Sequence, residues 1–479
     1  MKKSFSWTWL ILMLAAPAMR AQALPADPST IHTQGMRFLD AAGREIILRG
    51  ANTGGRSKLP PFIPFEPVPN FDSALNQYAD GVQALGFNVV RLLIIYEAAE
   101  PQRGKYDKEY LKKYDRMVAA FGSRGIRVIV DAHQDLFSRR FCGDGFPDWT
   151  LPEKYRSLPQ HADCKNWGLR DFTWPVTDTL EQFWSNRGGV QDNYIAFFKM
   201  LAERYQDDPM VIGFEPINEP FPGSVGRLSL GWFYKNQLFP LYEKVGQAVQ
   251  AVNPRYLIFA DIVPLENIGM WTSHRPRPAL KNLVFAPHYY DFGTYGMVAT
   301  SKFEQAFMHS GLARHQALQK AWDTPILVGE FGASPLMKGA AAYLGSLYDK
   351  FDDLKFSGTY WECSMSGTIW NLENTSCFNP DGSLRPAAAA LDRPYPRAVA
   401  GKINRFSFDA KSGKFQLTWD EDPGISLPTE IYLPARIYPD EPKINLEPAG
   451  KFDWDQSRRI LSISPLEKSA ERKIIIVPK

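Results

Sequence analysis

Short apolar runs alternate with longer amphipathic stretches over most of this chain. Eight runs are rich in Val, Ile, Leu and Phe, which is typical of strands buried on both faces, and helical periodicity separates most of them. The runs are residues 43–50, 88–95, 128–131, 211–215, 256–260, 283–286, 326–329 and 358–361, and the helical stretches are 70–85, 107–124, 191–205, 232–252, 303–322 and 340–351. Eight such strand–helix units predict an α/β fold, a (β/α)8 TIM barrel.

A doubly wound open sheet is the alternative fold for such an alternation. That fold usually carries a Gly-x-Gly-x-x-Gly turn after a strand, and no such turn follows any of the apolar runs. The barrel is therefore the favoured prediction. The periodicity is lost between residues 137 and 186, where we expect a long aromatic loop that contains two cysteines.

The pattern changes after residue 392. Pro, Gly and Asp then separate short segments of alternating apolar and polar residues, which is typical of strands in an antiparallel sheet. These segments are residues 406–408, 415–419, 430–433, 460–463 and 473–477. We therefore expect a barrel over residues 24–392 and a small C-terminal all-β sandwich over residues 393–479.

The first 23 residues have the pattern of a secretory signal peptide. Lys2 and Lys3 precede an apolar run, and Ala21-Gln22-Ala23 matches a small-x-small cleavage site. Cleavage would lower the formal net charge from +3 to 0, and a neutral protein is not expected to bind nucleic acid. The sequence therefore predicts a secreted or periplasmic protein, with an uncleaved anchor as the alternative.

The cysteine content agrees with export. The four cysteines are Cys142, Cys164, Cys363 and Cys377, and an even number in an exported protein favours disulfides over metal ligation. Of the three possible pairings we favour Cys142–Cys164 and Cys363–Cys377, which join neighbours in the sequence. No Cys-x-x-Cys or paired-histidine spacing occurs, so no metal site is expected.

Polar residues gather at the carboxyl ends of the apolar runs, which is the edge where TIM barrels place their active sites. Glu219 follows the run 211–215 within Asn218-Glu219-Pro220, and Glu330 lies at the tip of the run that begins at residue 326. Two glutamates on separate buried strands predict a glycosidase that works with a pair of carboxylates. The other polar or aromatic candidates on or after the runs are Arg91, His133, Gln134, Asp135, His288, Tyr289, Tyr290, Trp361 and Glu362.

The chemistry of glycoside cleavage suggests a role for each glutamate. The reaction needs an acid that protonates the leaving oxygen and a carboxylate that captures the anomeric carbon. We expect Glu219 to be the acid/base, with Asn218 on the sugar 2-hydroxyl. Glu330 is expected to be the nucleophile, kept ionised by Arg91 and Tyr290. Retention of configuration requires the two carboxyl groups to lie roughly 5 Å apart, whereas a separation of roughly 9 Å would indicate inversion.

Several motifs resemble those of clan-A glycoside hydrolases of family five. They are Asn218-Glu219-Pro220, Gly329-Glu330-Phe331-Gly332, His133 and His288-x-Tyr290. Three further segments resemble the endoglycoceramidase branch of that family: Arg49-Gly-Ala-Asn-Thr53 leading to Lys58, His133-Gln-Asp-Leu-Phe-Ser138 and Phe183-Trp-Ser-Asn186. The resemblance implies a retaining endo-β-glycosidase without a cofactor that cleaves the bond between glycan and ceramide in glycosphingolipids. Together with the positions at the strand ends, it makes Lys58, Arg91, His133, Asp135, Asn218, His288, Tyr290 and Trp361 the candidate substrate contacts.

Two alternatives remain open. The same residues could hydrolyse another β-glucoside, such as a steryl glucoside, a β-glucan or a mannan, or the chain could be an inactive carbohydrate-binding protein. The apolar stretch 221–239, directly after Glu219, favours a lipid beside the cleavage point, since burial of acyl chains there would be favourable. The expected partners are a glycolipid or oligosaccharide and, transiently, a membrane or micelle surface. We expect a monomer.

Overall fold

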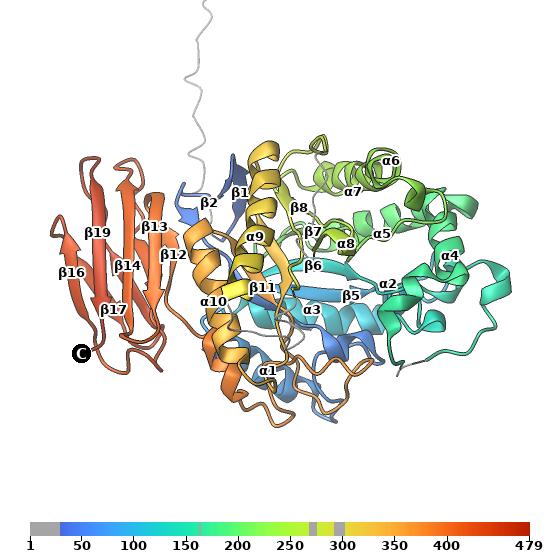
Figure 1. The fold of residues 1–479 in the computed structure, drawn as a ribbon, viewed down its shortest axis with the longest axis horizontal. Coiled ribbons are helices and arrows are strands. Elements are labelled where there is room, and N and C mark those ends of the chain that lie inside the picture. The colour runs from blue at the N-terminus through green and yellow to red at the C-terminus, as the bar shows by residue number, and fades with distance from the viewer. Residues whose placement is uncertain (1–28, 162–163, 268–274, 292–301) are drawn as a thin grey trace, which may run out of the picture.

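A computed structural model of the chain describes residues 29–161, 164–267, 275–291 and 302–479. Its largest unit is a parallel eight-stranded sheet with helices packed around it (Figure 1). The strand order is β10-β11-β4-β5-β6-β7-β8-β9, and parallel bridges from Phe285 to Ile326 and from Tyr289 to Phe331 join the two edges. The predicted (β/α)8 barrel is therefore confirmed. Its strands are β4 (Arg49–Asn52), β5 (Val89–Ile95), β6 (Arg127–His133), β7 (Val211–Glu215), β8 (Leu257–Ala260), β9 (Leu283–Phe285), β10 (Leu327–Phe331) and β11 (Ser357–Tyr360).

The helices lie close to their predicted positions, with two differences. The expectation of a long loop over residues 137–186 is wrong, because the helix α4 (Trp174–Trp184) lies within it. Pro175 occupies the first turn of this helix, where its missing N–H is tolerated. The predicted helix 232–252 contains a π-helical turn between α6 (Leu230–Phe233) and α7 (Phe239–Val252). The other helices are α1 (Phe71–Ala84), α2 (Tyr96–Ala99), α3 (Lys108–Gly122), α5 (Val190–Arg204), α8 (Pro264–Asn267), α9 (Lys302–Trp322) and α10 (Ala340–Leu354).

The segment 43–50, predicted as one barrel strand, is divided between two sheets. β3 (Glu45–Ile46) pairs antiparallel with β2 (Arg37–Asp40) and with β12 (Tyr395–Val399), whereas β4 pairs in parallel with β5 and β11. Ile47 is buried in the sandwich core, and Leu48 is buried in the core at the amino end of the barrel. The first barrel strand therefore begins at Arg49, because the preceding residues belong to the neighbouring domain's sheet.

The C-terminal region is a β-sandwich, as predicted (Figure 1). One sheet has the order β1-β2-β3-β12-β15-β18-β17 and the other has the order β13-β14-β19-β16. Phe406, Leu417, Ile431 and Ile463 pack between the two sheets in a single core. Since β1 to β3 precede the barrel in the chain, the first sheet joins residues from both ends of the sequence. The strands not yet given are β1 (Ile31–Gln34), β13 (Gly401–Asp409), β14 (Lys414–Glu421), β15 (Thr429–Tyr432), β16 (Lys443–Glu447), β17 (Phe452–Asp455), β18 (Ile460–Ile463) and β19 (Glu471–Val477).

Two disulfides connect the four cysteines in the expected pairing. Cys142 bonds to Cys164, and Cys363 bonds to Cys377. Both bridges lie in loops that follow barrel strands, the first after β6 and the second after β11. The expected signal peptide lies outside the described residues. Among the described helices, none is long and apolar enough to cross a membrane.

Candidate active site

The carboxyl ends of the barrel strands surround a cavity of about 570 Å3. Barrel closure brings together residues that are far apart in the sequence, from the loops after β4, β6, β7, β9, β10 and β11. Arg91 and His288 do not line this cavity. Both are fully buried beneath it and contact the glutamates. Of the two glutamates and the eight candidate substrate contacts, eight residues form part of its wall: Lys58, His133, Asp135, Asn218, Glu219, Tyr290, Glu330 and Trp361.

Arg91, on β5, fixes the relative positions of residues from four other strands or loops. Its Nε and Nη2 donate to the two carboxylate oxygens of Glu215, each at 2.7 Å. Nη1 donates to Asn52 Oδ1 at 2.9 Å and to Glu330 Oε1 at 2.8 Å, and Nη2 also donates to Asn218 Oδ1 at 2.8 Å. All five N–H groups of the guanidinium are therefore used. This arrangement holds Glu330 and Asn218 in a common framework beneath the cavity.

Asn218 is oriented on both sides of its amide group. Its Oδ1 accepts from Arg91, and its Nδ2 donates to the carbonyl of Gln134 at 3.0 Å. The Gln134 side chain returns the contact by donating to the Asn218 carbonyl at 2.8 Å. The second Nδ2–H has no acceptor among the described residues, so it is available to a hydroxyl group in the cavity.

Glu219 has the properties of a general acid. Its φ of 40° lies in the left-handed region, which is uncommon for a residue with a Cβ atom and costs energy. Its backbone N–H donates to Asp261 Oδ2 at 2.9 Å. Its carboxyl group contacts His288 Nδ1 at 2.9 Å. Burial, together with the negative charge of Asp135, raises the pKa of Glu219 to about 7. The group can therefore hold a proton near neutral pH and release it to a leaving oxygen.

Glu330 has the contacts of an ionised carboxylate. Its Oε1 accepts from Arg91, and its Oε2 accepts from the Tyr290 hydroxyl at 2.9 Å. One oxygen of Glu330, one oxygen of Glu219 and a ring nitrogen of His288 lie within 4.8 Å of one another. This proximity agrees with the separation of about 5 Å between carboxyl groups that retaining glycosidases use.

One wall of the cavity is polar and charged. Lys58, in the turn after β4, lies 2.6 Å from Asp135 Oδ2 and 3.5 Å from Glu373 Oε2, and its ammonium group lies 4.4 Å from the centre of the Trp361 ring. Gly54 makes this packing possible, because a Cβ atom there would lie 2.5 Å from the Trp361 indole. The wall thus offers carboxylate and ammonium groups beside an aromatic ring, a combination suited to sugar hydroxyls and ring C–H groups.

His133 adds a positive charge to this wall. Its ring stacks on Trp361 with a centroid separation of 5.2 Å and an interplanar angle of 12°. Nδ1 contacts Asp131 Oδ2 at 2.8 Å. Burial acts against a charged ring, but the Asp131 carboxylate and the hydrogen bond to it outweigh burial and raise the pKa of His133 to about 10. The ring is therefore an imidazolium that donates through Nδ1 to Asp131, while Nε2 lies 3.5 Å from Asp135 Oδ2.

The lining of the cavity also includes apolar side chains. They are Phe172, Phe221, Leu265, Met337 and Leu372, from the loops after β6, β7, β8, β10 and β11. Only part of the apolar stretch 221–239 borders the cavity. Within that stretch Phe221 lines the cavity, whereas its later apolar residues Phe233, Leu238 and Phe239 are buried in the main hydrophobic core.

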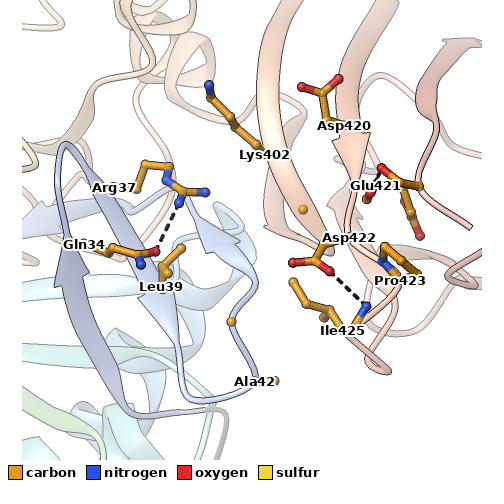
Figure 2. Close-up of a pocket in the computed structure, with 14 residues that line it drawn as sticks. Gln34, Arg37, Leu39, Ala42, Lys402, Asp420, Glu421, Asp422, Pro423 and Ile425 are labelled. Carbon is orange, nitrogen blue, oxygen red and sulfur yellow. Dashed lines mark hydrogen bonds between the residues drawn. The ribbon is translucent and has the colours of Figure 1, made fainter.

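A second cavity, of about 550 Å3, lies away from the barrel strand ends, between the β1–β2 hairpin and strands β13 and β14. Arg37 lies on the hairpin side, whereas Lys402, Asp420 and Asp422 lie on the side of β13 and β14 (Figure 2). Asp422 accepts from the backbone N–H of Gly424 at 2.9 Å, a contact internal to its own turn. Neither Glu219 nor Glu330 nor an aromatic side chain lines this cavity, so the candidate active site is the one in the barrel.

The geometry agrees with the comparison to known protein families. Residues 39–367 match the family described as Cellulase (glycosyl hydrolase family 5), and residues 393–477 match the glycoside hydrolase family 5 C-terminal domain. The chain belongs to glycosyl hydrolase family 5. It is a glycoside hydrolase with the two glutamates in one cavity.

Individual members of family 5 are similar over most of the chain. The endoglycoceramidase of Cyanea nozakii is 27% identical over 451 residues, which cover 86% of each chain. Endoglycoceramidase I of Rhodococcus hoagii (strain 103S) is 28% identical over 465 residues, which cover 92% of this chain and 87% of the relative. Among solved structures, endo-glycoceramidase II from Rhodococcus sp., as a lactosyl–enzyme intermediate, matches with a TM-score of 0.75 and 26% identity over 92% of this chain and 99% of that chain.

Several residues of this family 5 site were not predicted from the sequence. Glu215 and Asp131 are charged residues within apolar strands, which was a usable signal for a buried ion pair with Arg91. Glu373 lines the cavity, and burial raises its pKa to about 7. Asp144 lies behind Asp135. Glu373 and Asp144 are in irregular loops, where no periodicity marks a side chain as part of a site.

Proposed function

We propose that this family 5 hydrolase is a retaining endo-β-glycosidase that cleaves the bond between the glycan and the ceramide of glycosphingolipids. The observation that carries the proposal is a single cavity whose lining combines charged and aromatic side chains, apolar side chains and the two glutamates. The similarity to endoglycoceramidases over more than four-fifths of the chain supports the same substrate class. The solved structure of endo-glycoceramidase II with ganglioside GM3 adds support, at 25% identity.

The first chemical step forms a bond between Glu330 and the sugar. A carboxylate oxygen of Glu330 attacks the anomeric carbon while the protonated Glu219 donates its proton to the glycosidic oxygen, so that ceramide leaves as an alcohol. The free N–H of Asn218 is placed to bind a sugar hydroxyl, a contact that can strengthen as positive charge develops at the anomeric carbon.

The second step releases the glycan. Glu219, now a carboxylate, takes a proton from a water molecule, and the oxygen of that water attacks the anomeric carbon. The bond to Glu330 breaks, and Arg91 and Tyr290 again hold the free carboxylate. Two inversions at one carbon give net retention, so the product is the β-anomer.

The apolar side chains of the cavity favour a lipid as the leaving group. Glu219, the proton donor, must face the leaving oxygen, and Phe221 follows it by two residues while Leu265 comes from the adjacent strand, β8. Lys58 and Trp361 come from the loops after β4 and β11, which lie away from β7 and β8 in the strand order. The glycan is accordingly assigned to the charged wall and the ceramide to the side of Phe221 and Leu265.

A panel of substrates tests the proposal. Purified protein would be incubated in detergent micelles with lactosylceramide, glucosylceramide, a steryl glucoside, cellulose and mannan, with Glu330→Gln as the inactive control. We expect intact lactose and ceramide from lactosylceramide by mass spectrometry, and the β-anomer of lactose in early NMR spectra. Hydrolysis of cellulose or mannan alone, or of the steryl glucoside alone, would overturn the assignment.

Export to the periplasm or medium and a monomeric state are part of the proposal. Two disulfides support export, because such bonds persist in oxidising compartments. N-terminal sequencing of protein secreted by a bacterial host is expected to begin at residue 24. Sedimentation equilibrium is expected to give the mass of one chain, and a larger mass would contradict the monomer.

A further inference from the structure

Asp144 is a buried acidic residue that takes no part in the two proposed catalytic steps. Its side chain is fully buried. Among the described residues, no N–H or hydroxyl group donates a hydrogen bond to either of its carboxyl oxygens. An ionised carboxylate without donors in such a place is strongly unfavourable. Burial, and next the charge of Asp135, raise the pKa of Asp144 well above its usual range.

The loop that carries Asp144 holds this residue next to Asp135. The backbone N–H of Asp144 donates to the Asp135 carbonyl at 2.9 Å, and the two residues form an antiparallel bridge. Glycine is required on both sides: a Cβ atom at Gly143 would lie 1.7 Å from the Asp135 carbonyl oxygen, and one at Gly145 would lie 2.4 Å from Gln134 Cβ. Cys142, immediately before Gly143, is anchored by its disulfide.

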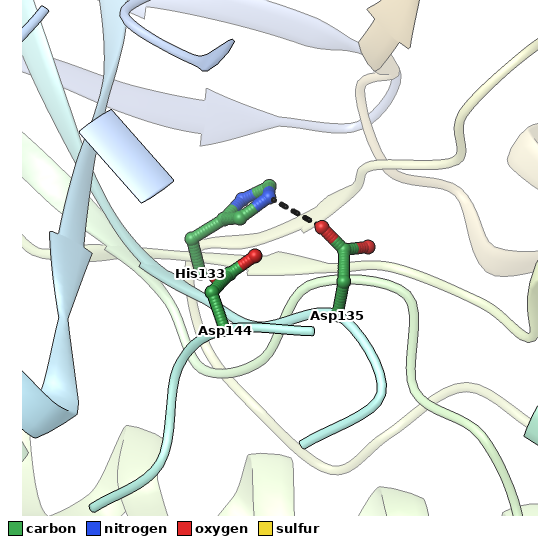
Figure 3. Close-up of side chains that lie close together, drawn as sticks. All are labelled: His133, Asp135 and Asp144. Atoms are coloured by element: carbon green, nitrogen blue, oxygen red, sulfur yellow. Dashed lines mark ion pairs between the residues drawn. The ribbon is translucent and has the colours of Figure 1, made fainter. Parts of the chain in front are cut away.

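Three side chains meet at this point. A carboxyl oxygen of Asp144, a carboxyl oxygen of Asp135 and a ring nitrogen of His133 lie within 4.8 Å of one another (Figure 3). Asp135 also accepts from Lys58 Nζ at 2.6 Å and lies 3.5 Å from His133 Nε2. Asp135 lines the cavity, whereas Asp144 does not. Asp144 can therefore reach a substrate only through Asp135.

We propose that Asp144 is a positioning residue that acts as a neutral carboxylic acid, its O–H donating to Asp135 and orienting that carboxylate toward a hydroxyl group of the bound glycan. The proposal rests on the proposed glycosidase function of the same cavity. A donor behind Asp135 joins Lys58, which donates to Oδ2, in fixing the orientation of the carboxylate, and lone pairs are left for a sugar hydroxyl.

One histidine and two aspartates could instead bind a metal ion. The contacts argue against it, because the Lys58 ammonium already lies 2.6 Å from Asp135 and 3.9 Å from the centre of the Trp370 ring. His133 is itself a cation through its pair with Asp131. Two positive groups thus already lie beside Asp135, and a third cation would be repelled.

Two variants of Asp144 separate a neutral donor from a charge. Asp144→Asn keeps an N–H donor and has no charge, so we expect its kcat/KM to stay within about threefold of wild type. Asp144→Ala removes the donor, and we expect KM to rise about 10- to 100-fold with a smaller change in kcat, since an oriented carboxylate contributes to binding. Asp148→Ala, in the same loop and partly exposed, is the matched control and is expected to leave KM unchanged.

Equal losses in the Asn and Ala variants would overturn the proposal, because they would show that the charge of Asp144 is needed. Wild-type kinetics in both variants would overturn it as well. Infrared difference spectra of wild type minus Asp144→Asn supply a readout that needs no substrate and no turnover. We expect the C=O stretch of a neutral carboxylic acid at neutral pH, and a carboxylate band in its place would refute the proposal even if the substrate panel had failed.

Discussion

His288 Nδ1 lies 2.9 Å from Glu219 Oε1, which places a buried imidazole against the proposed proton donor. The same nitrogen lies 3.5 Å from Glu330 Oε2. Burial lowers the pKa of His288 to about 3, so the ring is neutral at physiological pH and contacts Glu219 without adding positive charge. An imidazolium in this place would lower the pKa of Glu219, and less of the carboxyl group would then hold its proton at neutral pH.

The two histidines of the site thus differ in charge for a reason that can be traced to their neighbours. His133 pairs with the Asp131 carboxylate at 2.8 Å, and that pair overcomes the effect of burial. His288 has Arg91 among its neighbours, whose positive charge adds to the effect of burial. The charged ring lies at the glycan wall, and the neutral ring lies between the two glutamates.

Replacing the nucleophile tests the covalent mechanism. Glu330→Gln keeps the shape of the side chain but cannot form the glycosyl–enzyme ester, so we expect kcat to fall at least roughly 10³-fold. A 2-deoxy-2-fluoro β-glycoside with a good leaving group is expected to label the wild-type protein. Peptide mass spectrometry should then find one sugar on Glu330. Full activity of Glu330→Gln, or a label on another residue, would contradict the assignment.

Both glutamates could be predicted from the sequence because each follows an apolar strand. The carboxyl ends of barrel strands meet at one rim, so position in a strand is enough to bring Glu219 and Glu330 together. Glu215 and Asp131 were harder, since strand residues alternate between barrel interior and exterior and a one-residue shift in register reverses the direction. Their role as ion-pair partners of Arg91 is evident only from the structure, in which Arg91 contacts both carboxylates.

The shared sheet at the junction of the two domains could not be predicted. β3 has two residues, and its partner β12 lies at the other end of the chain. A strand this short has no measurable alternation, and pairing between distant segments leaves no local signal. Asp144 and Glu373 were missed for a related reason, because loop residues have no period from which to read the direction of a side chain.

Removing Arg91 is expected to destabilise the protein strongly. Arg91→Met would leave the buried carboxylates of Asp131, Glu215 and Glu330 without their common partner, and loss of one member of a buried ion network costs about 3–5 kcal/mol. Lys112→Met is the control, since Lys112 pairs with Glu109 at an exposed site, where such pairs contribute about 1 kcal/mol or less. Urea unfolding followed by circular dichroism would measure both, and equal midpoints for the two variants would contradict the ion network.

The disulfides are expected to be formed in the purified protein. Thiol titration of denatured, unreduced protein should detect no free thiol, and reduction should release four. Replacing both cysteines of either pair by serine is expected to lower the free energy of unfolding by about 3 kcal/mol, because each bond closes a loop in the unfolded chain. Four free thiols before reduction would show that the bonds do not form.

The proton donor gives a prediction about pH. Glu219 must be protonated for the first step, and its pKa is raised to about 7. We expect kcat/KM for a β-glycoside with an alcohol leaving group to be constant well below pH 7 and to fall tenfold per pH unit above it. In Glu219→Gln the rate is expected to fall by roughly 10²- to 10⁴-fold and the decline above pH 7 to disappear. A dinitrophenyl glycoside, whose leaving group needs no proton, should be affected far less in the first step.

Loss of the proton of Glu215 is the competing explanation for a fall of kcat/KM above pH 7. Burial raises its pKa to about 7 as well, although Arg91 acts in the opposite direction. Since Glu215 is intact in Glu219→Gln, a decline that persists in this variant would belong to Glu215 or another group, and the acid role of Glu219 would be refuted. A decline that disappears with Glu219 identifies it as the group whose proton reaches the leaving oxygen, and external azide should then restore turnover of the dinitrophenyl glycoside by attacking the sugar without a base.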